Sequence, residues 1–252
     1  MNRLKIAPAV KRDNISASVG DGLTAGRGDW SFSGDVAHSF VSHIRRSIPQ
    51  YSEGHDLVCR ISDFFVSANS TCYEIGASTG ELLRKLAVYN CSKPQARWIG
   101  LDLEEEMLKV AREHCAGLPN VELTVGDVAT YDYQPADLIV SYYCVQFVPP
   151  RVRQALIERL YKALNWGGAL ILFEKVRAPD ARFQDISTSL YNDFKTEQGF
   201  SDEEIMAKSR SLRGILEPFS SQANHELLRR AGFVDIWPVM KYVCFEGILA
   251  IK

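Results

Sequence analysis

The residues best placed to do chemistry in this chain lie between Tyr73 and Gly80, in the run Tyr-Glu-Ile-Gly-Ala-Ser-Thr-Gly. An apolar, strand-like run leads into Gly76, and Gly80 opens a helical pattern. A glycine turn between a strand and a helix lets the backbone approach a nucleotide closely. Asp102 ends the next apolar run, where a carboxylate can accept hydrogen bonds from ribose hydroxyls. Together these residues predict a site for an adenosine-containing ligand.

The spacing of the glycines separates one kind of nucleotide from another. A dinucleotide site uses Gly-x-Gly-x-x-Gly, so that the pyrophosphate rests on the helix N-terminus, but here Ala77, Ser78 and Thr79 stand between the two glycines. Glu74 would repel a pyrophosphate and suit a ligand with a cationic amino-acid part. The pattern resembles the Glu/Asp-x-Gly-x-x-x-Gly turn of class I S-adenosylmethionine (SAM) enzymes. A turn that only reverses the chain is the alternative, and the segments that follow argue against it.

Two further segments follow strand-like runs. Asp127 and Val128 come after the third run, where a carboxylate can accept from an adenine amino group. Ser141 to Gln146 comes after the fourth run and would face the sulfonium. Within it, Tyr142 and Tyr143 have two interpretations that stay open: an aromatic ring can stabilise the sulfonium, or the pair can fill the core. A single strand-end acid can be an exposed loop residue, but three in succession favour one site.

Composition limits the class of protein. The chain has 252 residues, a net charge of −2 and 46% hydrophobic residues, which suits one globular domain. Its charge balance does not favour direct nucleic-acid binding. No apolar run reaches the roughly 20 residues that span a bilayer, and the start shows no signal-peptide pattern. Six scattered cysteines lack metal-ligand spacing. We therefore expect a cytoplasmic protein with reduced thiols, no metal site and no membrane segment.

The periodicity predicts an α/β fold with a doubly wound, Rossmann-like sheet that is mostly parallel. Two helices, over 35–48 and 53–66, come first. Strands over 71–75, 97–102, 121–125, 137–141 and 169–173 then alternate with helices over 81–89, 104–115 and 152–164. After a helix over 221–231, strands over 234–239 and 243–250 form an antiparallel pair at one edge. Residues 1–28, rich in glycine and polar residues, are expected to be loosely structured, and 29–252 form the SAM-binding domain.

The pattern breaks after Lys175. Residues 179–216 show no strand and many charges, and they predict a pair of inserted helices. Because the insertion follows the fifth strand, it would lie over the carboxyl edge of the sheet, where ligands bind. We expect it to be a lid.

These motifs extend to a resemblance that covers residues 28 to 250. The runs that carry it include Gly28-Asp29-Trp30-Ser31-Phe32, Ile48-Pro49-Gln50-Tyr51-Ser52, Glu174-Lys175 and Asp193-Phe194-Lys195. The sequence resembles a divergent member of the carboxy-S-adenosylmethionine (carboxy-SAM) synthase family, in the class I methyltransferase superfamily. Enzymes of that family convert SAM and prephenate into a carboxylated sulfonium for transfer-RNA wobble-uridine modification. The resemblance implies SAM as the cofactor, a homodimer, and cofactor contacts at Tyr51, Gly76-Ala77-Ser78, Asp102-Leu103 and Asp127-Val128.

Two positions depart from the family pattern. Tyr142 stands where the family has an asparagine, and Ser209 stands where a lid arginine holds the transferred carboxylate. Arg210 is the next residue, but one step along a helix turns a side chain by about 100°. Losing a charge-assisted bond there would cost about 2–5 kcal/mol. These departures favour ordinary SAM in the pocket.

We therefore expect a SAM-dependent transferase, most simply a methyltransferase acting on a small metabolite. Its acceptor pocket would lie under the lid, lined by Tyr51, Tyr142, Tyr143, Tyr191 and Arg210, with Tyr142, Tyr191 or Ser209 orienting the nucleophile. Three alternatives stay open: cyclisation of the methionine chain of SAM with release of methylthioadenosine, carboxy-SAM synthesis with Arg210 or Arg213 supplying the charge, and a non-catalytic SAM-binding module. The apolar faces of the first two helices would serve a homodimer or pack on their own sheet.

Overall fold

A seven-stranded sheet organises the molecule. The computed structural model describes residues 16–32 and 36–252. The strands follow the spatial order β5-β4-β3-β6-β7-β9-β8, with bounds β3 (Thr71–Ile75), β4 (Arg97–Asp102), β5 (Val121–Val125), β6 (Ala136–Tyr142), β7 (Leu164–Lys175), β8 (Asp235–Tyr242) and β9 (Phe245–Ile251). Strands β3 to β7 are parallel, and β9 runs antiparallel to both β7 and β8. The predicted doubly wound sheet with an antiparallel last pair is confirmed.

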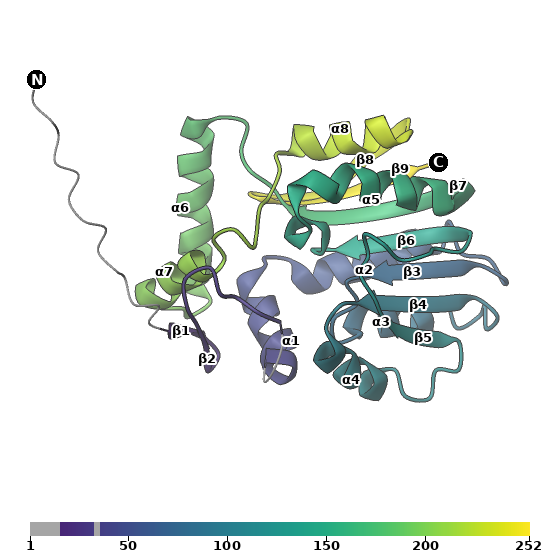
Figure 1. Cartoon of the computed structure of the whole chain (residues 1–252), viewed down its shortest axis with the longest axis horizontal. Coiled ribbons are helices and arrows are strands. Elements are labelled where there is room, and N and C mark those ends of the chain that lie inside the picture. Colours follow the sequence, from purple (N-terminus) through teal and green to yellow (C-terminus); the bar gives the residue numbers. More distant parts are fainter. Residues whose placement is uncertain (1–15, 33–35) are drawn as a thin grey trace, which may run out of the picture.

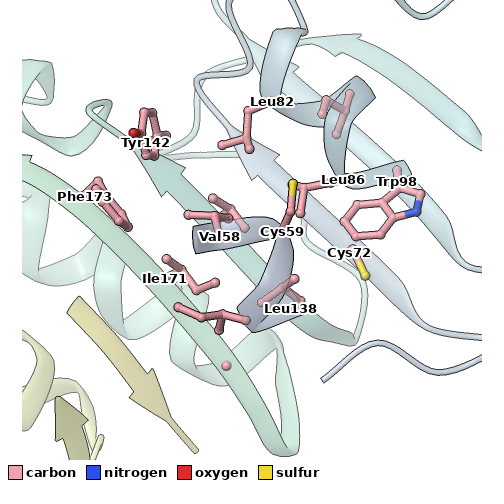
Figure 2. Packing of buried hydrophobic residues seen from close by; sticks show 14 of the residues in the cluster. Val58, Cys59, Cys72, Leu82, Leu86, Trp98, Leu138, Tyr142, Ile171 and Phe173 are labelled. Carbon is pink, nitrogen blue, oxygen red and sulfur yellow. The ribbon is translucent and has the colours of Figure 1, made fainter. Parts of the chain in front are cut away.

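Helices cover both faces of the sheet (Figure 1). On one face, α2 (Tyr51–Ser62) and α3 (Glu81–Tyr89) bury Val58, Leu82 and Leu86 against the strands, as Figure 2 shows. On the other face lie α5 (Pro150–Ala163) and α8 (Ser221–Ala231). This two-sided burial explains why almost every residue of β6, and of β7 from Gly168 to Glu174, is buried.

The first helices pack within the molecule. Helix α1 (Val36–Ser47) places Ala37 and Phe40 against Met107 and Val110 of α4 (Glu105–His114). Helix α2 lies on the sheet. Of the two roles that the sequence left open, the apolar faces of α1 and α2 have the intramolecular one.

The predicted insertion forms two helices, α6 (Ala181–Glu197) and α7 (Asp202–Ser211). They stand beyond the end of the sheet at which the parallel strands terminate (Figure 1). A capping box starts α7, because the Ser201 hydroxyl accepts from the Glu204 amide and the Glu204 carboxylate accepts from the Ser201 amide. The Tyr191 hydroxyl donates to the Ser47 carbonyl over 2.9 Å and ties α6 to α1.

A hairpin precedes α1. Strands β1 (Ala17–Gly20) and β2 (Leu23–Ala25) pair antiparallel, and their apolar residues bury against the lid helix α7. The prediction of loose structure is therefore wrong for residues 17–25, while residues 1–15 lie outside the described residues. The glycines were interpreted as breakers, but Gly20 (φ 93°) and Gly22 (φ 75°) supply the positive φ that this tight turn requires.

Candidate functional site

The glycine turn lies against the tip of the neighbouring strand. The amides of Gly76 and Ala77 both donate to the Leu101 carbonyl, over 2.7 and 3.0 Å. Gly76 has φ 72°, and a Cβ there would lie 2.6 Å from the Cys144 side chain. A residue with a side chain would clash with Cys144 at this position and would be strained at this positive φ, so both the tight turn and the packing of Cys144 require glycine.

Asp102 is held in place by backbone amides. Its Oδ2 accepts from the Ser78 amide over 2.7 Å, and its Oδ1 accepts from the Glu104 amide over 3.0 Å. Burial raises the pKa of Asp102, and these hydrogen bonds oppose that effect. Each carboxylate oxygen has a further lone pair, so the group can also accept from ribose hydroxyls.

Glu74 is a buried acid at the same edge. It is 3% exposed, and its Oε2 has no hydrogen-bond partner among the described residues. Burial, and next the charge of Asp102, raise the pKa of Glu74 well above its usual range. A cationic group beside Glu74 would satisfy this oxygen and lower that pKa again. The site therefore fits the ammonium and sulfonium charges of SAM.

The strand tips converge as the sequence predicts. The Gly126 amide donates to the Asp102 carbonyl over 2.8 Å, and Ile75 lies in register with Ser141. Cys144 lies near the acids of several strand ends. Burial raises the pKa of its thiol well above the usual range, and so do the nearby charges of Asp102, Glu174, Glu74 and Asp127. The predicted cofactor contacts themselves stay predictions.

The remaining predicted cofactor residues differ in accessibility. Asp127 is exposed, and its Oδ1 accepts from the Ala129 amide, whereas Val128 is buried. Leu103 is 66% exposed at the rim. The buried Ser141 hydroxyl has no partner among the residues that the structure describes.

Tyr142 points into the core and not at a reaction centre. Its hydroxyl donates to the Tyr51 carbonyl over 2.7 Å. Its ring packs on that of Phe173 (Figure 2) and also on that of His55. Gly54 makes room for it, since a Cβ there would lie 2.1 Å from the Tyr142 oxygen. These contacts favour the core-filling interpretation of Tyr142. The prediction that Tyr142 orients a nucleophile stays a prediction, and the structure shows its proton already donated within the fold.

A cavity of about 640 Å³ lies under the lid. It is enclosed by α1, the N-terminal hairpin, α6, α7 and the segments that follow β6 and β7. Of the predicted catalytic residues, Tyr191 and Ser209 line it. The other predicted lining residues, Tyr51, Tyr142, Tyr143 and Arg210, do not. Arg210 is exposed, because consecutive residues of α7 point in different directions.

Three lysines make the lining of this cavity basic, and the sequence analysis did not identify them as site residues. Lys175, Lys195 and Lys208 line it, and none of them forms a salt bridge in the part of the chain that the structure describes. Burial, and next the charge of Lys175, lower the pKa of Lys195 to about 8. Burial, and next the charge of Lys195, lower the pKa of Lys208 to about 6. Burial also lowers the pKa of Lys175.

The lysines are held by aromatic rings. The Nζ atoms of Lys175 and Lys195 lie 4.0 and 4.5 Å from the Tyr191 ring centroid, and Lys208 lies over Trp30. Of the two acids in the lining, Glu204 is engaged by the α7 cap and by Ser18. Near pH 7 Lys195 is charged, whereas Lys208 is mostly neutral until an anion favours its charged form. The cavity is thus a desolvated basic site that fits an anion. A lysine that ends an apolar strand, as in Leu-Ile-Leu-Phe-Glu-Lys, was the signal available in the sequence.

Other kinds of site find no support in residues 16–32 and 36–252. No cluster of histidine, cysteine, aspartate and glutamate in these ranges has the arrangement of a metal site. Nor does any helix there combine the length and apolarity needed to cross a membrane. All six cysteines are free thiols.

Comparison with known proteins identifies the family of this chain. A methyltransferase-domain family model matches residues 73–168. A carboxy-S-adenosyl-L-methionine synthase of Staphylococcus epidermidis is 38% identical over 88% of this chain and 97% of its own. A carboxy-S-adenosyl-L-methionine synthase of Chromohalobacter salexigens is 35% identical over 89% of this chain and 84% of its own. The solved SAM complex of human N-acetylserotonin methyltransferase shares the fold, with a TM-score of 0.53 and 18% identity over 86% of this chain and 59% of that one. The chain is a SAM-dependent enzyme and belongs to the carboxy-S-adenosyl-L-methionine synthase family.

Proposed function

We propose that this protein is a carboxy-SAM synthase, which transfers a carboxyl group to SAM from an anionic donor held under the lid. The observation that carries the proposal is the set of three unpaired lysines, Lys175, Lys195 and Lys208, in the cavity at the carboxyl edge of the sheet. An anion in this cavity would offset the desolvation of these ammonium groups. The names of the relatives support the same product, and the resemblance stated from the sequence implies prephenate as the donor.

The lysines can supply the positive charge that Ser209 lacks at the position of the family arginine. Without the family arginine, a carboxylate at this position lacks a guanidinium partner. Lys208 is the preceding residue and lines the same cavity, as does Arg213. Lys195 and Arg213 therefore supply positive charge without Arg210, and a bound anion would favour the charged form of Lys208. An ammonium group still lacks the two-pronged geometry of arginine.

Methyl transfer to an anionic metabolite is the second candidate. It is favoured by Ser209, a short polar side chain that lines the cavity where the family places its carboxylate-binding arginine. Cyclisation of SAM is less favoured, because it needs a closed cage without room for a second substrate, and the cavity measures about 640 Å³.

Product analysis separates these reactions. The purified protein is incubated with SAM, with and without prephenate, and the nucleosides are identified by mass spectrometry. We expect carboxy-SAM only when prephenate is present, and we expect Lys195→Met to abolish it while SAM still binds. Methylthioadenosine formed from SAM alone would indicate cyclisation. S-adenosylhomocysteine formed only with an added acceptor would indicate methyl transfer.

We also propose that the enzyme acts in the cytoplasm as a homodimer, and we assign the contact between subunits to α6. Phe183, Ile186 and Leu190 lie three and four residues apart, so they share one face of α6, and each is about half exposed. Sedimentation of Ile186→Glu/Leu190→Glu should show a monomer where the unaltered chain sediments as a dimer.

A further inference from the structure

A histidine and an aspartate from distant parts of the chain form a pair at the wall of the cavity. His43 on α1 lines the cavity and is 2% exposed. Its Nδ1 lies 2.8 Å from Oδ2 of Asp21, in the turn of the N-terminal hairpin. Its buried Nε2 has no hydrogen-bond partner among the residues that the structure describes. A buried acceptor without a protein partner in a residue that lines a cavity is a candidate contact for a ligand donor.

The contact with Asp21 sets the protonation of the ring. A carboxylate only accepts hydrogen bonds, so the proton of a neutral ring resides on Nδ1 and leaves a lone pair on Nε2. Burial, and next the charge of Lys208, lower the pKa of His43 to about 4 despite the opposing effect of Asp21. The ring is therefore neutral near pH 7, and its free nitrogen is an acceptor.

Neighbouring groups fix the orientation of the pair. Asp21 has φ 56°, which aspartate tolerates, and it also forms an ion pair with Arg46. Trp30 stacks on the His43 ring at 5.8 Å between centroids, and Phe200 meets it edge-on at 5.8 Å. These contacts come from the hairpin, α1 and the segment between the lid helices.

The surroundings decide which donor fits Nε2. Lys208 is close enough for its charge to lower the pKa of His43, so an ammonium donor would be repelled. A neutral hydroxyl is favoured, since it can donate to Nε2 while its oxygen accepts from a lysine. The cavity walls also carry Phe32, Phe40 and Phe147, which suit an apolar ring.

We propose that Nε2 of His43 accepts a hydrogen bond from a hydroxyl group of the substrate, and that His43 thereby selects ring-bearing hydroxy carboxylates. Asp21 is a positioning residue that keeps the acceptor lone pair directed away from itself. The inference rests on the proposed function only in taking the lid cavity as the substrate site.

Calorimetry with two probes that differ by one hydroxyl group tests this. We expect 4-hydroxyphenylpyruvate to bind about tenfold more tightly than phenylpyruvate. In His43→Phe this preference should vanish, through weaker binding of the hydroxylated probe and an affinity for phenylpyruvate unchanged within about twofold. His43→Gln keeps an acceptor and should retain part of the preference.

Lys195→Met serves as the matched control, because it should weaken both probes equally and leave their ratio unchanged. Equal affinities in the unaltered protein, no binding of either probe, or a preference retained in His43→Phe would each overturn the role of His43. Failure of carboxy-SAM formation with an intact probe preference would reject the proposed reaction and leave the role of His43 standing.

Discussion

At the scale of single residues, the two halves of the site carry buried charges of opposite sign. Glu74 is an acid whose pKa is raised by burial, and Lys195 is a base whose pKa burial lowers to about 8. In each case the protein disfavours the ionised form until an opposite charge arrives. A cationic cofactor and an anionic second substrate are the ligands that satisfy both groups.

Asp102→Ala should weaken SAM binding by about 1–3 kcal/mol, because it removes an acceptor for the ribose. It also frees the Ser78 and Glu104 amides, which now donate to that carboxylate. Isothermal calorimetry measures the loss, and Asp127→Ala, which removes an exposed carboxylate, is the matched control with a smaller effect. An unchanged affinity for Asp102→Ala would contradict the ribose assignment.

Lys195→Met should stabilise the fold while it abolishes activity. The folded-state pKa of Lys195 is depressed from 10.5 to about 8, so charging this lysine opposes folding. That penalty is fully present below about pH 8 and disappears as the pH rises through about 10.5. We expect urea unfolding near pH 7 to show a gain of about 1–3 kcal/mol. A variant less stable than the unaltered protein would contradict the burial cost.

At the scale of elements, helix α2 and the end of strand β6 pack closely against each other through Gly54 and Tyr142. Gly54 leaves the space that Tyr142 fills, and the Tyr142 hydroxyl closes the contact on the Tyr51 carbonyl. Tyr51 is thus held in place by the residue that departs from the family pattern. The departure at Tyr142 is compensated within the fold and does not enlarge the substrate site.

Gly54→Ala should destabilise the protein by about 1–3 kcal/mol through overpacking against the Tyr142 oxygen. Tyr142→Phe removes that oxygen, so the double variant should recover part of the loss. Chemical unfolding of the four proteins gives the coupling energy. Strictly additive effects would show that the two side chains do not meet.

At the scale of the whole molecule, three distant segments close one cavity over the edge of the sheet. The N-terminal hairpin packs on α7, the Gly28 amide donates to the Arg210 carbonyl over 3.0 Å, and α6 is tied to α1. Binding of an anion in this cavity would therefore depend on the packing of all these segments and not on one element.

Phenylpyruvate should raise the melting temperature more near pH 7 than near pH 9.5. Below about 8, Lys195 is charged, and an anion relieves its desolvation, whereas above that pH the lysine is neutral and attracts the anion less. Thermal melts at matched ionic strength measure the difference, with Lys195→Met as a control in which the pH dependence shrinks. An equal shift at both pH values would argue against anion binding at Lys195.

The sequence by itself determined the sheet, the glycine turn and the acids at successive strand tips, including Glu74 and Asp102. These features are local: apolar periodicity and a positive φ depend on near neighbours along the chain, and parallel strands bring their carboxyl ends to one edge. Most element ranges predicted from periodicity agree with the structure for the same reason, but β7 begins at Leu164 instead of residue 169 and α2 ends at Ser62 instead of residue 66.

Only the tertiary structure decided what lies under the lid. The pairing of His43 with Asp21, the grouping of Lys175, Lys195 and Lys208, and the inward turn of Tyr142 join residues far apart in sequence. Their chemistry depends on burial, which long-range packing creates: the same lysine on an open surface has its ordinary pKa and binds nothing in particular. The predicted cofactor residues could therefore be identified from the sequence, whereas the cavity proposed for a second substrate is a property of the packed molecule.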